Sequence, residues 1–406
     1  MLPAPVTFLV QRPLTERDRR RFCVDGLLEQ GFHVRVIDFG PLLLPDIPAD
    51  RSHYPAIRDL SVSVVADRLG LDKAMDLLKK DGGVAVCLIA GKTFTPAAAR
   101  VLRGLGRAGV PYVQLLNAEV PGAVPGSLTE GVFRRLAHLL RGRNLVKSLV
   151  ARLPLGLQGI PFAAACIHGG EQSRTKGMLI GPTTRAVAAH APDWEVIRQL
   201  ADTPANPTST AIFLDQFLPF HPDLQETGGR WPVAGPYFSA LRTLFSRIED
   251  ELGLEVVVAV HPRSDYPARG GDLFGGRRLI QGNTAALVRD CRLVIAHHST
   301  AISFAVASDK PVLLVGSRDI WAADPVIERV GRAYGKALNR PVHSLDNVEA
   351  IDLTNIFDVD REAYGAFVTD YLKAPNSPDL PLCATMADAL VNLFPSVRPR
   401  QAVTSP

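Results

Sequence analysis

The sequence predicts an α/β protein made of two doubly wound, Rossmann-like domains that face a central cleft. Segments typical of strands and helices alternate along both halves of the chain, which indicates βαβ units and a mostly parallel sheet. A stretch rich in Pro, Ser and Thr at 201–209 interrupts this alternation, which then starts again. The 406 residues suffice for two domains of ordinary size, and 47% of them are hydrophobic, so each domain can bury a core.

The first half contains short apolar runs that predict buried strands, because β-branched residues between turn-forming residues favour extended structure. Amphipathic stretches separate these runs. One opens at the capping residue Thr15, and another has Pro96 in its first turn, where proline is tolerated. The predicted strands are 6–10, 33–39, 84–90, 112–116 and 163–167, and the predicted helices are 15–30, one that includes 73–80, and 95–107.

The second half repeats the same alternation. Its predicted strands are 211–214, 256–260, 278–280, 293–296 and 312–315, and its predicted helices are 237–252, 284–290, 300–307, 361–372 and 385–394. We therefore place an N-terminal domain at 1–205, a C-terminal domain at 206–378, and a C-terminal helix with its tail at 379–406. A ligand is expected in the cleft between the two domains.

The composition excludes several classes of protein. The net charge of +4 is modest and no zinc-finger or RNA-binding motif is present, so we expect no nucleic-acid partner. The five cysteines are scattered and odd in number, which is typical of free core residues in a reducing compartment, and no Cys/His cluster predicts a metal site. The first ten residues lack the charged region of a signal peptide, and no apolar run reaches the ~18–20 residues of a membrane span, so we expect a cytoplasmic protein.

Two turns in the second half carry groups that bind anions. One apolar run ends at His261-Pro-Arg263, and another ends at His298-Ser299-Thr300. The carboxyl ends of neighbouring parallel strands face one crevice where ligands bind, so both turns are expected to contact the same ligand. Imidazole, guanidinium, hydroxyl and N–H groups at a helix start suit a nucleotide phosphate. A solvated strand end and a helix cap are the simpler interpretations of these turns.

Acidic residues near the same strand ends are candidate bases. Asp215 ends the first strand of the second domain, a position suited to a general base for a hydroxyl acceptor. Asp223 and His221 lie on the following loop and are alternatives. A carboxylate that caps a helix or a turn is the simpler interpretation.

Three residues of the first half are candidate contacts to a ligand in the cleft. His168 and Gly169 follow a predicted strand, and a glycine at a strand end permits close approach of the backbone to a ligand. Asp193 lies shortly before the Pro/Ser/Thr-rich stretch. A simple turn and a helix cap are the alternative interpretations.

The segment 132–153 carries six basic residues and no acid, with leucine and valine between them. This basic amphipathic pattern predicts peripheral contact with an anionic inner membrane. A solvated helix face is the alternative.

The second half resembles GT-B glycosyltransferases, and more narrowly bacterial sialyltransferases, polysialyltransferases and related capsule or lipopolysaccharide sugar transferases. Those proteins carry an acidic motif, a His-Pro motif and a Ser-Ser/Thr motif at a helix start. The matches here lie within about 208–318 and are Asp215 (or Asp223), His261-Pro and Ser299-Thr300. The acidic match departs from the family pattern, because Asp215-Gln-Phe stands where two acids and a glycine are usual.

The resemblance implies a GT-B fold and a metal-independent transferase that needs no cofactor beyond its donor. The donor would be a CMP-activated acidic sugar, such as a sialic-acid-like nonulosonate or Kdo, and the acceptor a hydroxyl of a cell-surface glycan, glycolipid or protein. His261, Ser299 and Thr300 would contact the donor phosphate, and the acid would deprotonate the acceptor. The alternatives are a GT-B transferase that uses UDP- or another NDP-sugar, a sugar-nucleotide epimerase, and a non-catalytic nucleotide-sugar-binding protein of envelope assembly.

Overall fold

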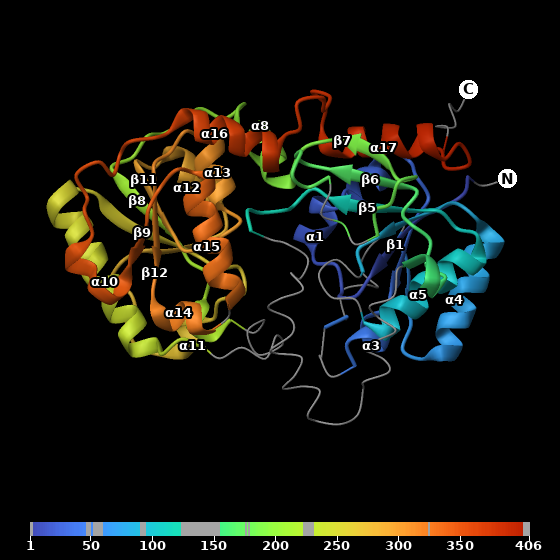
Figure 1. Ribbon diagram of the computed structural model, residues 1–406, viewed down its shortest axis with the longest axis horizontal. Helices are drawn as coiled ribbons and strands as arrows, with labels where there is room; N and C mark the ends of the chain where they lie inside the picture. The colour runs from blue at the N-terminus through green and yellow to red at the C-terminus, as the bar shows by residue number, and fades with distance from the viewer. Residues whose placement is uncertain are drawn as a thin grey trace, which may run out of the picture. The chain divides into compact units, whose positions relative to one another are not determined.

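The computed structural model describes residues 3–45, 50–51, 60–89, 95–122, 155–174, 177, 179–221, 231–323 and 325–400. The chain divides into two compact units (Figure 1). Unit 1 comprises Met1–Asn117, Val124–Pro192 and Ala374–Pro406, and unit 2 comprises Ala118–Ala123 and Asp193–Lys373. Each unit is built on one parallel sheet with helices, so the predicted pair of Rossmann-like α/β domains is confirmed. The cleft between them stays a prediction.

Unit 1 has a sheet of seven parallel strands in the order β3-β2-β1-β4-β5-β6-β7. Its elements are β1 (Val6–Val10), α1 (Glu16–Arg21), α2 (Val24–Glu29), β2 (Val34–Asp38), α3 (Gly40–Leu43), β3 (Ser61–Val64), α4 (Arg68–Asp81), β4 (Val84–Cys87), α5 (Pro96–Ala108), β5 (Tyr112–Leu116), the 3₁₀ turn η2 (Leu155–Gln158), β6 (Ala165–His168), β7 (Arg185–Ala188) and α17 (Leu382–Leu393).

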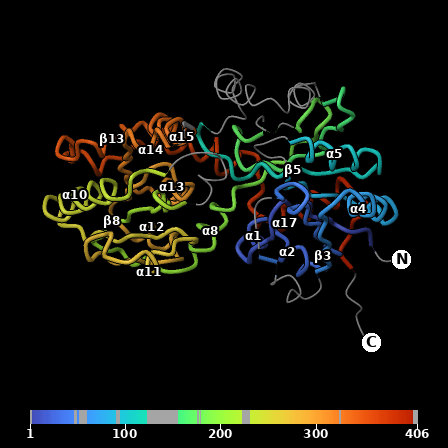
Figure 2. Tube along the Cα trace, turned by 90° about the horizontal axis from the view of Figure 1, so that it is seen from below, coloured from blue at the N-terminus to red at the C-terminus, as the bar shows by residue number. Residues whose placement is uncertain are grey.

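Two helical layers cover this sheet. Leu27 of α2 and Leu390 of α17 belong to the core on one side, and Leu78 of α4 and Leu105 of α5 belong to the core on the other. Helices α4 and α5 lie side by side in both views (Figures 1 and 2). The C-terminal helix α17 packs against α2, so the end of the chain returns to unit 1.

The helix predicted at 15–30 is two short helices. Thr15 caps α1 as expected, with its hydroxyl accepting from the Asp18 N–H at 3.2 Å. Cys23 has a φ of 62°, a left-handed conformation that ends α1 before α2 begins. Only α2 buries residues against the sheet, through Val24 and Leu27, whereas α1 has no buried residue.

Unit 2 has a sheet of six parallel strands in the order β10-β9-β8-β11-β12-β13. Its elements are α8 (Pro192–Leu200), β8 (Thr210–Leu214), the 3₁₀ turn η3 (Leu218–Phe220), α10 (Ala234–Leu252), β9 (Glu255–Val260), α11 (Tyr266–Arg269), β10 (Leu279–Gln281), α12 (Thr284–Asp290), β11 (Leu293–Ala296), α13 (Ile302–Ala307), β12 (Val312–Gly316), α14 (Arg318–Ala323), α15 (Pro325–Ala337), β13 (Val342–Ser344), the 3₁₀ turn η4 (Leu345–Ala350) and α16 (Arg361–Phe367), which a wide turn at Val368–Leu372 extends.

The stretch 201–209, predicted to link the domains, is bound to α12 of unit 2. The Arg289 guanidinium donates to the carbonyl oxygens of Leu200, Thr203 and Pro204 at 2.9–3.3 Å. The long segment of unit 2 therefore begins at Asp193, whereas the sequence predicts a boundary after 205. Residues from Ala374 onward belong to unit 1, because the buried face of α17 completes the core of that unit.

None of the helices in the described part of the chain has the length and apolar character that crossing a bilayer requires.

Candidate functional site

The candidate site lies at the carboxyl ends of the strands of unit 2. The strand order reverses between β8 and β11, and in open parallel sheets ligands bind at such a reversal. Asp215 follows β8, His261 follows β9, and His298 lies two residues after β11. The β8 and β11 ends are joined directly, because the His298 backbone N–H donates to Gln216 Oε1 at 3.1 Å.

The Asp215 carboxylate joins three segments of this edge. One oxygen accepts from the Phe217 N–H and the Tyr266 hydroxyl, both at 2.9 Å, and the other accepts from the His261 N–H at 3.1 Å. Asp215 is only 5% exposed. Burial raises the pKa of Asp215, and the hydrogen bonds from Phe217, His261 and Tyr266 oppose that rise. The carboxylate thus holds the turn of His261 in place, and its predicted role as acceptor base stays a prediction.

His221, His261 and Arg263 are brought together at the end of β9. The rings of His221 and His261 are 4.9 Å apart between centroids and nearly perpendicular. An Arg263 guanidinium nitrogen lies 3.2 Å from His221 Nε2 and can only donate, so this imidazole nitrogen accepts. The Arg263 backbone N–H donates to His261 Nδ1 at 3.2 Å, which places the proton of a neutral His261 on Nε2. Gln281 of β10 supports the turn by donating to the Pro262 carbonyl at 2.9 Å.

The two adjacent histidines after β11 have different surroundings. His297 is 2% exposed; its Nδ1 lies 2.8 Å from the Val315 carbonyl and its Nε2 lies 3.1 Å from the Tyr237 hydroxyl. Burial lowers the pKa of His297 to about 4. His297 is therefore a neutral core residue.

His298 keeps a polar atom without a protein partner. Its Nδ1 is buried and has no hydrogen bond within the described part of the chain. Burial, with the nearby His297 and His221, lowers the pKa of His298 to about 3. A buried polar atom of this kind needs a partner, which a ligand or water can supply.

Ser299 and Thr300 form the turn into α13. Ser299 Oγ accepts from the Ala301 N–H at 3.2 Å within this turn, but α13 itself has Ala301 at its N-cap and no side-chain cap hydrogen bond. Thr300 is exposed, and its carbonyl accepts from the Ser303 N–H. Helix α13 begins at Ile302, two residues later than the predicted start, because these residues form the turn.

The remaining candidates lie elsewhere. His168 ends β6 of unit 1, is 3% exposed, and has its Nδ1 3.1 Å from the Gly170 carbonyl oxygen. Asp193 lies in the first turn of α8 in unit 2. Asp223 and the basic segment 132–153 lie outside the described residues.

Gly169 is explained by packing within unit 1. A Cβ there would lie 3.0 Å from the Ala191 backbone nitrogen and 3.1 Å from the Asn117 backbone. Backbone atoms cannot move away as the end of a flexible side chain can. Gly169→Ala is therefore expected to lower the free energy of unfolding by about 1–3 kcal/mol. Chemical denaturation followed by circular dichroism measures this change. Gly156→Ala is the matched control, because nothing lies within 4 Å of its Cβ position. Equal stability of the two variants would contradict the packing explanation.

Four residues that support the site were not predicted from the sequence. Gln216, Tyr237, Tyr266 and Gln281 each hydrogen bond to a residue at least 19 positions away in the chain. No local spacing marks such residues, since each acts across two elements. The position of Gln216 directly after the candidate acid was the one usable signal.

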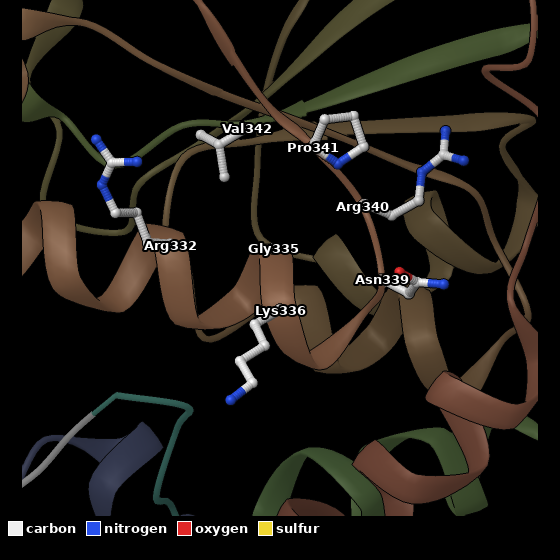
Figure 3. Close-up of a pocket in the computed structure, with 7 residues that line it drawn as sticks. All are labelled: Arg332, Gly335, Lys336, Asn339, Arg340, Pro341 and Val342. Carbon is white, nitrogen blue, oxygen red and sulfur yellow. The ribbon is translucent and has the colours of Figure 1, made fainter.

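A hollow of about 470 Å³ lies in unit 2 between the end of α15 and the start of β13 (Figure 3). It is lined by Arg332, Gly335, Lys336, Asn339, Arg340, Pro341 and Val342. The Arg340 N–H donates to the Gly335 carbonyl, and Asn339 has a φ of 50°, which is a usual way to end a helix such as α15. Basic side chains there stabilise the negative end of the helix dipole, and Lys336 points away from the two arginines. The basic side chains that line the hollow are therefore explained by their position at the end of α15.

No protein-family model matches the chain. No curated protein is similar to it at the level of sequence. Solved structures do match. CalG4, described as the calicheamicin glycosyltransferase, is 15% identical, with 97% of this chain and 99% of that chain covered and a TM-score of 0.54. A UDP-GlcNAc 2-epimerase from Methanocaldococcus jannaschii is 10% identical, with 96% and 99% covered and a TM-score of 0.51. MurG from Acinetobacter baumannii is 11% identical, with 96% and 100% covered and a TM-score of 0.50.

These likenesses show a shared fold. They extend over nearly the whole length of each chain, and both sheets of this chain are parallel and doubly wound. The predicted GT-B-like fold is therefore confirmed.

Proposed function

We propose that the protein is a glycosyltransferase that takes a sugar from a nucleotide-sugar donor whose phosphate binds unit 2. The observation that supports this is the gathering of His221, His261 and Arg263 at the carboxyl edge of the sheet, beside the unpartnered Nδ1 of His298. These donors are held in place before any ligand arrives. Such preorganised groups stabilise negative charge that develops on a leaving phosphate.

The reaction breaks the bond between the anomeric carbon of the sugar and a donor phosphate oxygen, which keeps the electron pair. The acceptor hydroxyl oxygen forms the new bond to that carbon, and its proton passes to a base. In this proposal His261 Nε2–H and the Arg263 guanidinium bind the phosphate. Asp215 and Asp223 are the proposed bases; the burial of Asp215 and its three donors favour Asp223.

For the donor we propose a CMP-activated acidic sugar, on the strength of the His261-Pro and Ser299-Thr300 motifs. A UDP- or other NDP-sugar is the alternative. The shared fold with a UDP-GlcNAc 2-epimerase favours a second candidate function, the epimerisation of a nucleotide sugar. A transferase releases free nucleotide only when an acceptor is present. An epimerase converts the sugar of the nucleotide sugar without an acceptor. A non-catalytic binding protein does neither.

His261→Ala is expected to weaken nucleotide binding by about 1–3 kcal/mol, the range for a hydrogen bond to a charged group. A thermal-shift comparison of CMP, UDP, GDP and ADP first identifies the nucleotide, because a ligand that binds only the folded state raises the melting temperature. Calorimetry with that nucleotide then gives the affinities. His343→Ala is the control, since His343 is also partly buried but lies on the edge strand β13. Unchanged affinity in His261→Ala would contradict the proposed site.

A further inference from the structure

Helix α5 of unit 1 presents a basic face. Its sequence holds Arg100, Arg103 and Arg107 and no acidic residue. Spacings of three and four residues put these side chains on one face of the helix, opposite the buried Leu102 and Leu105. Arg100 and Arg107 are exposed and Arg103 is partly so. Within the described residues none of the three arginines has a hydrogen bond or an ion pair with a carboxylate.

The neighbouring helix does not neutralise this face. Helix α4, which packs beside α5 (Figure 2), carries four basic and three acidic residues. The positive charge of the three arginines is therefore available to an external anion.

Two exposed apolar side chains belong to the segment that contacts α5 at Gly106, one residue before Arg107: Leu157 in η2, and Phe162 directly after Pro161. Leu157 is 73% exposed and Phe162 is 39% exposed. The loop packs on α5, because a Cβ at Gly106 would lie 3.0 Å from Pro161 Cδ. The Tyr112 hydroxyl donates to the Pro161 carbonyl at 2.7 Å and fixes the loop to the sheet. Leu157 and Phe162 are thus carried by an anchored segment beside the arginines.

We propose that this surface, formed by Arg100, Arg103, Arg107, Leu157 and Phe162, docks on an anionic lipid bilayer. Guanidinium groups bind lipid phosphates, while a leucine and a phenylalanine enter the boundary between headgroups and acyl chains. A nucleic acid would use the arginines but would leave the exposed apolar side chains without a role. The proposal is independent of sugar transfer and of the segment 132–153.

The test measures cosedimentation of the full chain with vesicles of phosphatidylcholine, with and without phosphatidylglycerol. The wild type should bind the anionic vesicles and lose affinity as salt rises, because a Debye length of about 10 Å at 0.1 M shrinks to about 3 Å at 1 M. Changing Arg100, Arg103 and Arg107 together to glutamine should weaken binding by on the order of 100-fold. Leu157→Ser should weaken it by about tenfold.

A matched control changes Arg278, Lys336 and Arg361 of unit 2 to glutamine. These residues are also exposed, and both triple variants lower the net charge from +4 to +1. The control should bind like the wild type. Equal losses in the two triple variants, an α5 variant that binds normally, equal binding to uncharged vesicles, or wild-type binding to duplex DNA but not to vesicles would each overturn the proposal. Circular dichroism verifies that every variant is folded.

Discussion

Replacing Asp215 with alanine is expected to lower the free energy of unfolding by about 3 kcal/mol or more and to weaken nucleotide binding. The change leaves the Phe217 N–H, the His261 N–H and the Tyr266 hydroxyl without their acceptor in a buried place. An unsatisfied buried group costs about 1–3 kcal/mol, so three of them exceed what is gained by removing a buried charge. The turn of His261 then loses its anchor. Denaturation followed by tryptophan fluorescence is the measurement, because Trp194, Trp231 and Trp321 all belong to unit 2.

Two milder variants separate positioning from base catalysis. Tyr266→Phe removes one of the three donors and should lower the free energy of unfolding by only about 1 kcal/mol. Asp215→Asn keeps the shape, but its amide nitrogen faces a donor, so both stability and nucleotide affinity should fall. Turnover that drops by about 10²–10⁴ while stability and affinity stay unchanged would assign Asp215 as the acceptor base instead. If Asp215 only positions the turn of His261, Asp223 is the acceptor base. Asp223→Asn should then abolish turnover and leave nucleotide affinity intact.

Acidification from pH 7 toward pH 4 is expected to destabilise unit 2 by about 3 kcal/mol through His297. Burial lowers the pKa of this histidine from 6.5 to about 4. Between these values the unfolded chain binds a proton that the folded chain does not, so stability rises with pH. The contribution is fully present above about pH 6.5 and is lost as the pH falls through about 4, with a slope of about 1.4 kcal/mol per pH unit. His298 acts in the same direction, because burial and the nearby His297 and His221 lower its pKa as well.

The slope of unfolding free energy against pH, followed by tryptophan fluorescence, is the quantity to measure. His297→Gln removes one titrating group and should lower the slope between pH 6.5 and 4 by about 1.4 kcal/mol per pH unit, whatever the absolute stability of the variant. His298→Gln should keep the contribution of His297 to the slope. A wild-type slope that persists in His297→Gln would show that other groups dominate acid unfolding.

The sequence alone determined the central strands and the turns that follow them. Strands β9 and β11 were predicted within one residue of their observed bounds, because buried parallel strands are uninterrupted apolar runs. The His-Pro-Arg and His-Ser-Thr turns could be assigned to one edge for the same reason, since all carboxyl ends of a parallel sheet share an edge. Local chemistry and strand direction suffice for such inferences.

Only the tertiary structure decided the edge strands and the role of each polar group. Strands β3 and β7 are short and partly exposed, so they are recognisable only from the strands with which they pair. The dipeptide His297-His298 does not indicate which of the two rings packs against Phe213 and hydrogen bonds to the Val315 carbonyl. The three donors to Asp215 come from separate segments, so its burial depends on how those segments pack. Side-chain environment is set by contacts between distant parts of the chain, which a local pattern does not contain.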